Sequence, residues 1–147
     1  MNDFSKLEKE ARESAGYIAQ QRLIYLKNIY QIYHRNFYKL NQLLKAFSDP
    51  EKMLPIWDIE RRDDLDLVLI ELLTYLHNYL ASFKTLVDHT RIIMDRDYTD
   101  HDFYKDYQSR VNTDFAENPL ACFIQNLRNY LLHYSLPSTF SEFNISK

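Results

Sequence analysis

The sequence has almost no glycine and almost no cysteine. Its 147 residues include one glycine, Gly16, where average usage would give about ten. Hairpin turns, β-bulges and phosphate-binding loops all depend on glycine, which argues against a β-rich fold, a Rossmann fold and a P-loop enzyme. The one cysteine, Cys122, excludes an internal disulfide and a zinc site built on cysteines. An all-α protein is the class that remains.

Long hydrophobic runs are also missing. Residues 1–11 are charged, and no stretch of 18 consecutive apolar residues occurs. A signal peptide and a membrane-spanning helix both need such runs, so neither is expected. The length fits a single domain over residues 1–147. We therefore expect one helical domain in the cytoplasm, with no membrane partner.

Charge is distributed unevenly, although the net charge is only -3. No acidic residue occurs between Ser14 and Ser48, a segment with five basic ones: Arg22, Lys27, Arg35, Lys39 and Lys45. Such a run is typical of a solvated basic helix face, and it also suits contact with phosphates. Aromatic side chains in the same segment fit a core, a dimer interface or a surface that stacks bases: Tyr17, Tyr25, Tyr30, Tyr33 and Tyr38.

Apolar spacings of three and four predict two long antiparallel helices, over Ser5–Phe47 and Arg62–Arg96. Asp49-Pro50 should end the first, followed by a turn or one-turn helix up to Trp57. The second is apolar on much of its circumference and so should be central. Its polar positions fall in one stripe, which indicates either a wet side or a polar groove: Glu71, Asn78, Ser82, Thr85, His89 and Arg96.

Two shorter helices should complete a bundle of four main helices. Residues 99–102 resemble a capping box ahead of a helix of about 15 residues, with Phe103, Tyr107 and Val111 pointing inward. Asn118-Pro119 is a stronger start signal for a helix up to residue 134 or 135. After that helix, Phe140, Phe143 and Ile145 are expected to fold back on the bundle. The predicted core face of the fourth helix is broad: Leu120, Phe123, Ile124, Leu127, Tyr130, Leu131 and Tyr134.

Opposite that core face, Asn129 and His133 lie one turn apart, and Arg128 lies on the flank. Imidazole can take or give a proton at neutral pH, which suits attack by a ribose 2′-hydroxyl on the adjacent phosphate. Arginine offers a planar fork that matches phosphate oxygens. One such set supplies a single proton carrier, and a two-fold dimer would supply two. Taken alone, His133 also suits an end-of-helix histidine, and Arg128 suits a structural ion pair.

The segment Arg128-Asn129-Tyr130-Leu131-Leu132-His133 resembles the R-N-x-x-x-H form of the Arg-x4-6-His motif of HEPN domains, a superfamily of small helical bundles. The resemblance covers these six residues, together with chain length and the C-terminal position of the motif. It implies a metal-independent endoribonuclease that cleaves RNA as a homodimer, as a toxin or anti-phage effector with an antitoxin or regulatory partner. His133 would then be the general acid or base, Arg128 the phosphate contact and Asn129 the orienting residue.

The sequence departs from one branch of that superfamily. In toxins partnered by a small nucleotidyltransferase the motif continues as Arg-x4-His-x-Tyr, whereas Ser135 occupies that position here and Tyr134 comes one residue early. Other HEPN domains are non-catalytic RNA-binding or protein-interaction modules, which is the alternative function. No cofactor or metal site is expected. His89 is a weaker candidate, which would support the motif only if the polar stripe faces the fourth helix.

Overall fold

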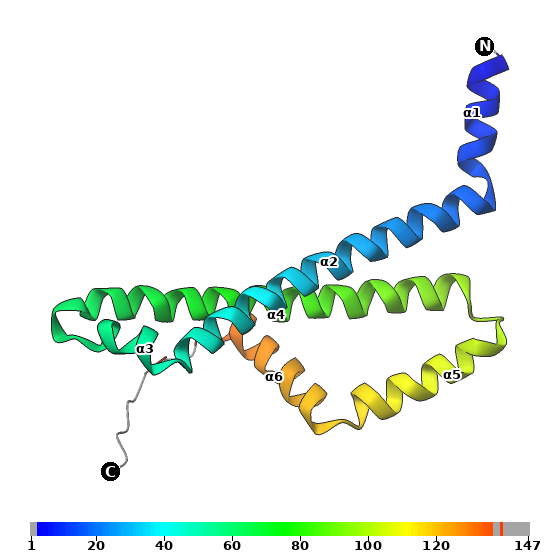
Figure 1. Ribbon diagram of the computed structural model, residues 1–147. Coiled ribbons are helices and arrows are strands. Elements are labelled where there is room, and N and C mark those ends of the chain that lie inside the picture. Colours follow the sequence, from blue (N-terminus) through cyan, green and yellow to red (C-terminus); the bar gives the residue numbers. More distant parts are fainter. Residues whose placement is uncertain (1–2, 137–138, 140–147) are drawn as a thin grey trace.

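The computed structural model describes residues 3–136 and 139, and over these residues the chain is all-α (Figure 1). Six α-helices are present in this part of the chain: α1 (Asp3–Glu13), α2 (Ala15–Phe47), α3 (Pro50–Met53), α4 (Arg62–Asp97), α5 (Asp102–Val111) and α6 (Pro119–His133). Two 3-10 turns, η1 (Leu54–Trp57) and η2 (Ile59–Arg61), and one π-helical turn, η3 (Asn112–Ala116), connect them. The predicted packing of Phe140, Phe143 and Ile145 lies outside the described residues.

The two long helices pack antiparallel, as predicted, with α2 crossing over α4 in Figure 1. Aromatic rings fill the crossing: Tyr79 of α4 lies 5.7 Å from Tyr33 and 5.9 Å from Phe37, measured between ring centroids. Burial, together with a hydrogen bond to Tyr33, raises the pKa of Tyr79 to about 12. The apolar side chains buried in this pair of helices recur along its length: Ile29, Leu40, Leu69, Leu80 and Ile93.

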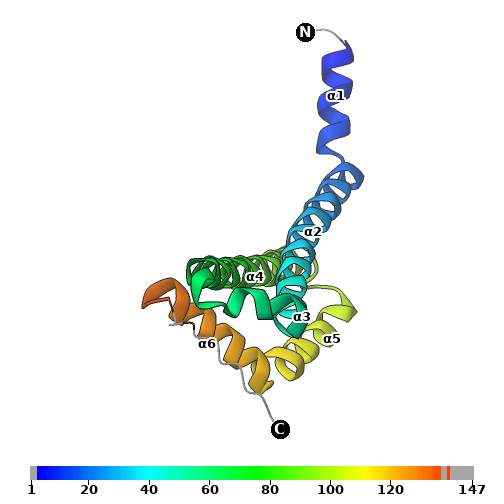
Figure 2. The same cartoon turned by 60° about the vertical axis from the view of Figure 1, so that its left-hand side comes forward.

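The first predicted helix is not continuous from Ser5, because the helix is interrupted at Ser14. The Ser14 backbone is extended (φ -64°, ψ 142°), and its hydroxyl accepts a hydrogen bond from the Tyr17 N–H at 3.3 Å. Serine hydroxyls compete with helical hydrogen bonds and favour a cap at such a position. The prediction of one helix over 5–47 is therefore wrong. A separate α1, none of whose residues is buried, projects away at an angle (Figure 2).

The connection between the long helices follows the prediction. Asp49 caps α3 by accepting a hydrogen bond from the Glu51 N–H at 3.2 Å, and Pro50 occupies the first helical position. Met53 of α3 is the buried side chain of this segment, at 4% exposed.

At the other end of the pair, Arg22 of α2 forms an ion pair with Asp97 of α4 at 2.7 Å. Hydrogen bonds from Arg96 and the charge of Arg22 lower the pKa of Asp97.

Residues 102–116 form the predicted third helix as α5 followed by η3, but the capping box is wrong. Thr99 donates its hydroxyl hydrogen bond to the Asp95 carbonyl at 3.2 Å, and His101 stands at the cap position without a side-chain cap. Of the three residues expected to point inward, Tyr107 and Val111 are half-buried. Phe103 is 47% exposed, because it packs locally against Tyr98 at 5.3 Å rather than against the long helices.

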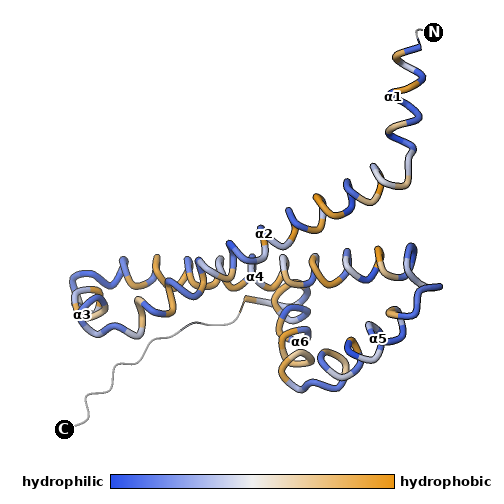
Figure 3. Tube along the Cα trace, turned by 45° about the vertical axis from the view of Figure 1, so that its right-hand side comes forward, coloured by the Kyte–Doolittle hydropathy of each residue, from blue (hydrophilic) through white to orange (hydrophobic). Residues whose placement is uncertain are grey.

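The chain leaves much of its apolar surface uncovered. Large apolar side chains of several helices are mostly exposed, among them Leu23 at 69%, Leu67 at 64% and Phe123 at 59%. Figure 3 shows hydrophobic positions along α2 and α6. Several of their side chains are exposed, such as Leu23 and Phe123.

Candidate active site on helix α6

Helix α6, which carries the candidate site, begins and ends as local sequence signals require. Asn118 accepts hydrogen bonds from the Leu120 N–H at 2.9 Å and the Ala121 N–H at 3.3 Å. Pro119 follows at the first position, where its missing N–H costs nothing. His133 closes the last turn, where the helix dipole favours a cation. The predicted start is confirmed.

The side of α6 that packs on α4 is narrower than predicted. Leu131 is 8% exposed, and Ala121, Ile124 and Leu127 are half-buried. Four residues predicted to belong to the core face are exposed instead: Leu120 at 65%, Phe123 at 59%, Tyr130 at 46% and Tyr134 at 82%. Phe123, Tyr130 and Tyr134 lie together at one edge of the apolar side, which α4 does not cover. Leu120 lies in the first turn of α6. The prediction is therefore wrong for these four side chains.

Arg128 comes from the α4 side of the helix and is half-buried. It lines a cavity of about 370 Å³ between α4, η3 and α6, together with Phe83, Arg91 and Phe115. Its Nη1 donates a hydrogen bond to Asn129 Oδ1 at 3.0 Å, while its Nε is buried without a hydrogen-bond partner. No carboxylate in the described part of the chain pairs with it, so the ion pair with an acid of the second or third helix that the alternative interpretation expects is not formed there.

His133 is exposed, one turn after Asn129. At about 100° per residue, His133 lies about 40° from Asn129 and about 140° from Arg128 around the helix. The hydrogen bond to Asn129 draws the Arg128 guanidinium back toward the His133 side. The three residues thus form a chain of neighbours, with Asn129 in the middle. No hydrogen bond joins His133 to the other two in the described residues.

His89 does not support this site. It faces α2, where Tyr25 Oη lies 3.3 Å from His89 Nε2 and the two rings meet edge to face at 5.1 Å. The α4 side chains nearest α6, including Phe83 and Arg91, lie on the other side of the helix. The interpretation of His89 as a supporting residue is therefore wrong.

The polar stripe of α4 is partly covered by α2 and is not exposed to solvent along its whole length. Ser82 is 7% exposed, and Asn36 donates to the Asn78 carbonyl at 3.2 Å.

Arg91 was missed by sequence reasoning. It is exposed on α4 and lines the same cavity as Arg128, so it places a second guanidinium near the motif. Nothing in the local sequence marks it, because its position depends on where α6 crosses α4. Cys122 lies on the opposite rim, with its thiol 3.4 Å from the Ala116 carbonyl.

Two features are absent from the described residues. No cluster of three or more histidine, cysteine, aspartate or glutamate side chains is arranged to hold a metal ion there. Nor does any helix in that part combine the length and the hydropathy that crossing a membrane would take. In the comparisons with known proteins, no family model, curated protein or solved structure matches the chain.

Proposed function

We propose that this chain is a metal-independent endoribonuclease that acts as a homodimer, with a HEPN-like site made of Arg128, Asn129 and His133. The observation that carries the proposal is the hydrogen bond between Arg128 and Asn129 one turn before the exposed His133. A guanidinium for phosphate, an orienting amide and an accessible imidazole then lie within two turns of one helix, with the amide between the other two.

The chemistry needs no group beyond these side chains. His133 removes the proton from a ribose 2′-hydroxyl, and the 2′-oxygen attacks the adjacent phosphorus. The bond to the 5′-oxygen breaks, and that oxygen receives a proton from the second His133, supplied by the other subunit. The products are a 2′,3′-cyclic phosphate and a 5′-hydroxyl. Arg128 stabilises the charge that develops on the phosphate oxygens.

Exposed apolar side chains on the side of α6 next to His133 support the dimer. Tyr130 and Phe123 lie about 60° and 80° from His133 around α6, and both are largely exposed in the single chain. A two-fold contact through this side would cover them and bring two motifs together.

The biological role that fits is a toxin or anti-phage effector with an antitoxin or regulatory partner. Ser135 stands where that branch has its tyrosine, which argues against a nucleotidyltransferase partner of the kind described above.

Cleavage of mixed RNA by the purified protein in the presence of a chelator tests the proposal. His133→Ala should lower the rate by about 10²- to 10⁴-fold, the usual contribution of a general acid or base. His101→Ala is the matched control, because His101 is exposed but belongs to a different segment. Absence of cleavage by the wild-type protein, or cleavage that His133→Ala leaves undiminished, would show that the chain is not this enzyme.

A non-catalytic RNA-binding module is the second candidate, and the basic surface of α2 favours it. Lys27 and Arg35 are exposed and have no hydrogen-bond or ion-pair partner in the described residues. Binding that weakens steeply with salt and survives His133→Ala, without any cleavage, would identify this second function.

A further inference from the structure

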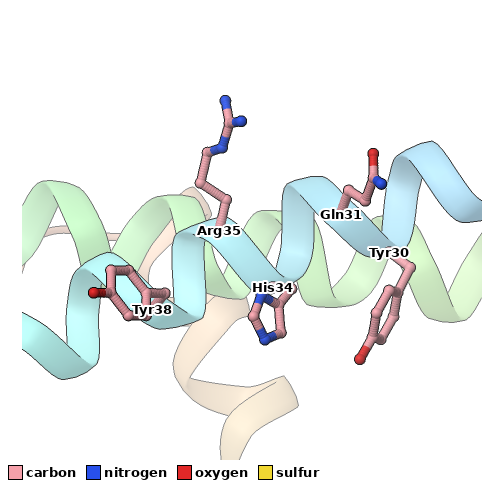
Figure 4. Close-up of a pocket in the computed structure, with 5 residues that line it drawn as sticks. All are labelled: Tyr30, Gln31, His34, Arg35 and Tyr38. Carbon is pink, nitrogen blue, oxygen red and sulfur yellow. The ribbon is translucent and has the colours of Figure 1, made fainter.

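The outer surface of α2 carries two parallel columns of side chains. One column contains three rings one turn apart, Tyr30, His34 and Tyr38, and the other contains Lys27, Gln31 and Arg35. Residues four apart lie on the same side of a helix, about 6 Å apart along its axis. Figure 4 shows Tyr30 and His34 leaving one side of α2, and Gln31 and Arg35 leaving the other.

The rings in the first column are open to a ligand. Tyr30 is 53% exposed and Tyr38 is 56% exposed, and His34 is also exposed. Tyr30 and His34 lie 6.1 Å apart between ring centroids, tilted by 34°. With Gln31 and Arg35 they line a shallow hollow of about 500 Å³. Tyr33, by contrast, is half-buried against Tyr79 and Phe83. The tyrosines of α2 therefore include both core residues and exposed ones.

The second column supplies uncompensated positive charge. The chain has no acidic residue from 15 to 47, and Lys27 and Arg35 are unpaired within the described part of the chain. Arg22 and Lys39 are engaged elsewhere on α2, the first by Asp97 and the second over the Tyr75 ring at 5.6 Å. Lys27 and Arg35 therefore remain available to an anion.

From this arrangement we infer that the ladder formed by Tyr30, His34 and Tyr38, with Lys27 and Arg35 beside it, binds single-stranded RNA. Unpaired bases stack on the exposed rings, and their phosphates follow the basic column. Charge complementarity favours this occupant over a second copy of the chain, because two copies would bring unpaired cations of the same sign together. From the proposed function the inference takes only that the ligand is RNA.

Binding is measured with the His133→Ala protein in chelator, so that cleavage cannot remove the probe, using a single-stranded oligouridine. Tyr30→Ala and Tyr38→Ala should each weaken binding by roughly 5- to 150-fold, the range for loss of one stacked base. Arg35→Gln should lower the slope of log affinity against log salt by about 0.7, the amount for one phosphate contact on a single strand. Leu67→Ala is the control, since Leu67 is 64% exposed on α4 and does not belong to the surface of α2.

Several results would overturn the inference. One is unchanged affinity in Tyr30→Ala and Tyr38→Ala, and another is absence of RNA binding at low salt. Loss of a dimer in Tyr30→Ala without loss of RNA affinity would assign the surface to a second copy. Tyr30→Leu keeps an apolar side chain but removes the ring, so its weaker binding at unchanged helicity separates stacking from folding. Because these assays use a cleavage-deficient chain, their failure is independent of the cleavage test.

Discussion

The α2–α4 pair and α6 are both rich in apolar side chains, but they differ in how many of them the chain itself covers. In the pair, Leu80 is 3% exposed and aromatic rings fill the crossing. In α6 the buried side chain is Leu131, while Phe123 and Tyr130 remain at the surface. The difference shows that the two long helices cover their shared side, although Leu67 of α4 stays 64% exposed, whereas α4 leaves one apolar edge of α6 uncovered.

The largest effect should come from damage to the pair. Leu80→Ala should destabilise the protein by about 2–5 kcal/mol, because it removes buried methyl groups and leaves a cavity. Leu67→Ala on the same helix is the matched control: Leu67 is 64% exposed, so its loss should change stability by no more than about 0.5 kcal/mol. Denaturant unfolding measures both. Equal effects would mean that the pair is not packed as described.

The next effect concerns the uncovered side of α6. Phe123→Asp should weaken self-association by about 30-fold or more, the threshold for a buried aromatic at an interface. Sedimentation equilibrium measures this. Phe4→Asp is the control, because Phe4 is 76% exposed on α1 and away from α6. A wild-type chain that is monomeric at high concentration, or a dimer that tolerates Phe123→Asp, would contradict an interface through α6.

Alkaline pH should weaken the pair through Tyr79. The folded pKa of about 12 lies above the ordinary value of 10.0, so the neutral ring favours the folded state. That contribution is complete below pH 10.0 and is lost as the pH rises toward 12. Tyr79→Phe should reduce the loss of stability over this range, as followed by thermal unfolding. If the variant loses stability with pH as steeply as the wild type, the tyrosine is not the cause.

The smallest effect should come from the ion pair between Arg22 of α2 and Asp97 of α4. The pKa of Asp97 is lowered from 3.8, so its charge stabilises the folded state above that pH and ceases to do so as the pH falls through the folded value. Asp97→Asn should therefore cause a small loss of thermal stability at neutral pH, and high salt should diminish the difference. A difference that persists in acid would exclude the charge as its cause.

The long antiparallel helices and two helix starts were predicted correctly, whereas the capping box at residues 99–102 was not. The long helices follow from apolar spacing, and the starts at Asp49-Pro50 and Asn118-Pro119 follow from cap chemistry within three residues. The break at Ser14 was missed because the apolar pattern continues across it, while a single hydroxyl decides the backbone there. At the candidate site, the adjacency of Asn129 and His133 was foreseeable from helical spacing, but the contribution of Arg91 was not.

The sequence by itself predicted an all-α chain, because glycine is nearly absent. In such a chain, phosphate contacts are expected to come from side chains on helices. The sequence also determined which residues share a side of each helix, because that follows from 3.6 residues per turn. Only the tertiary structure decided which of those sides are covered. It placed Phe123 and Tyr130 outside, His89 against Tyr25, and Arg91 beside Arg128. The physical reason is that a helical pattern identifies an apolar side, but the crossing of two helices sets how much of that side a neighbour can reach.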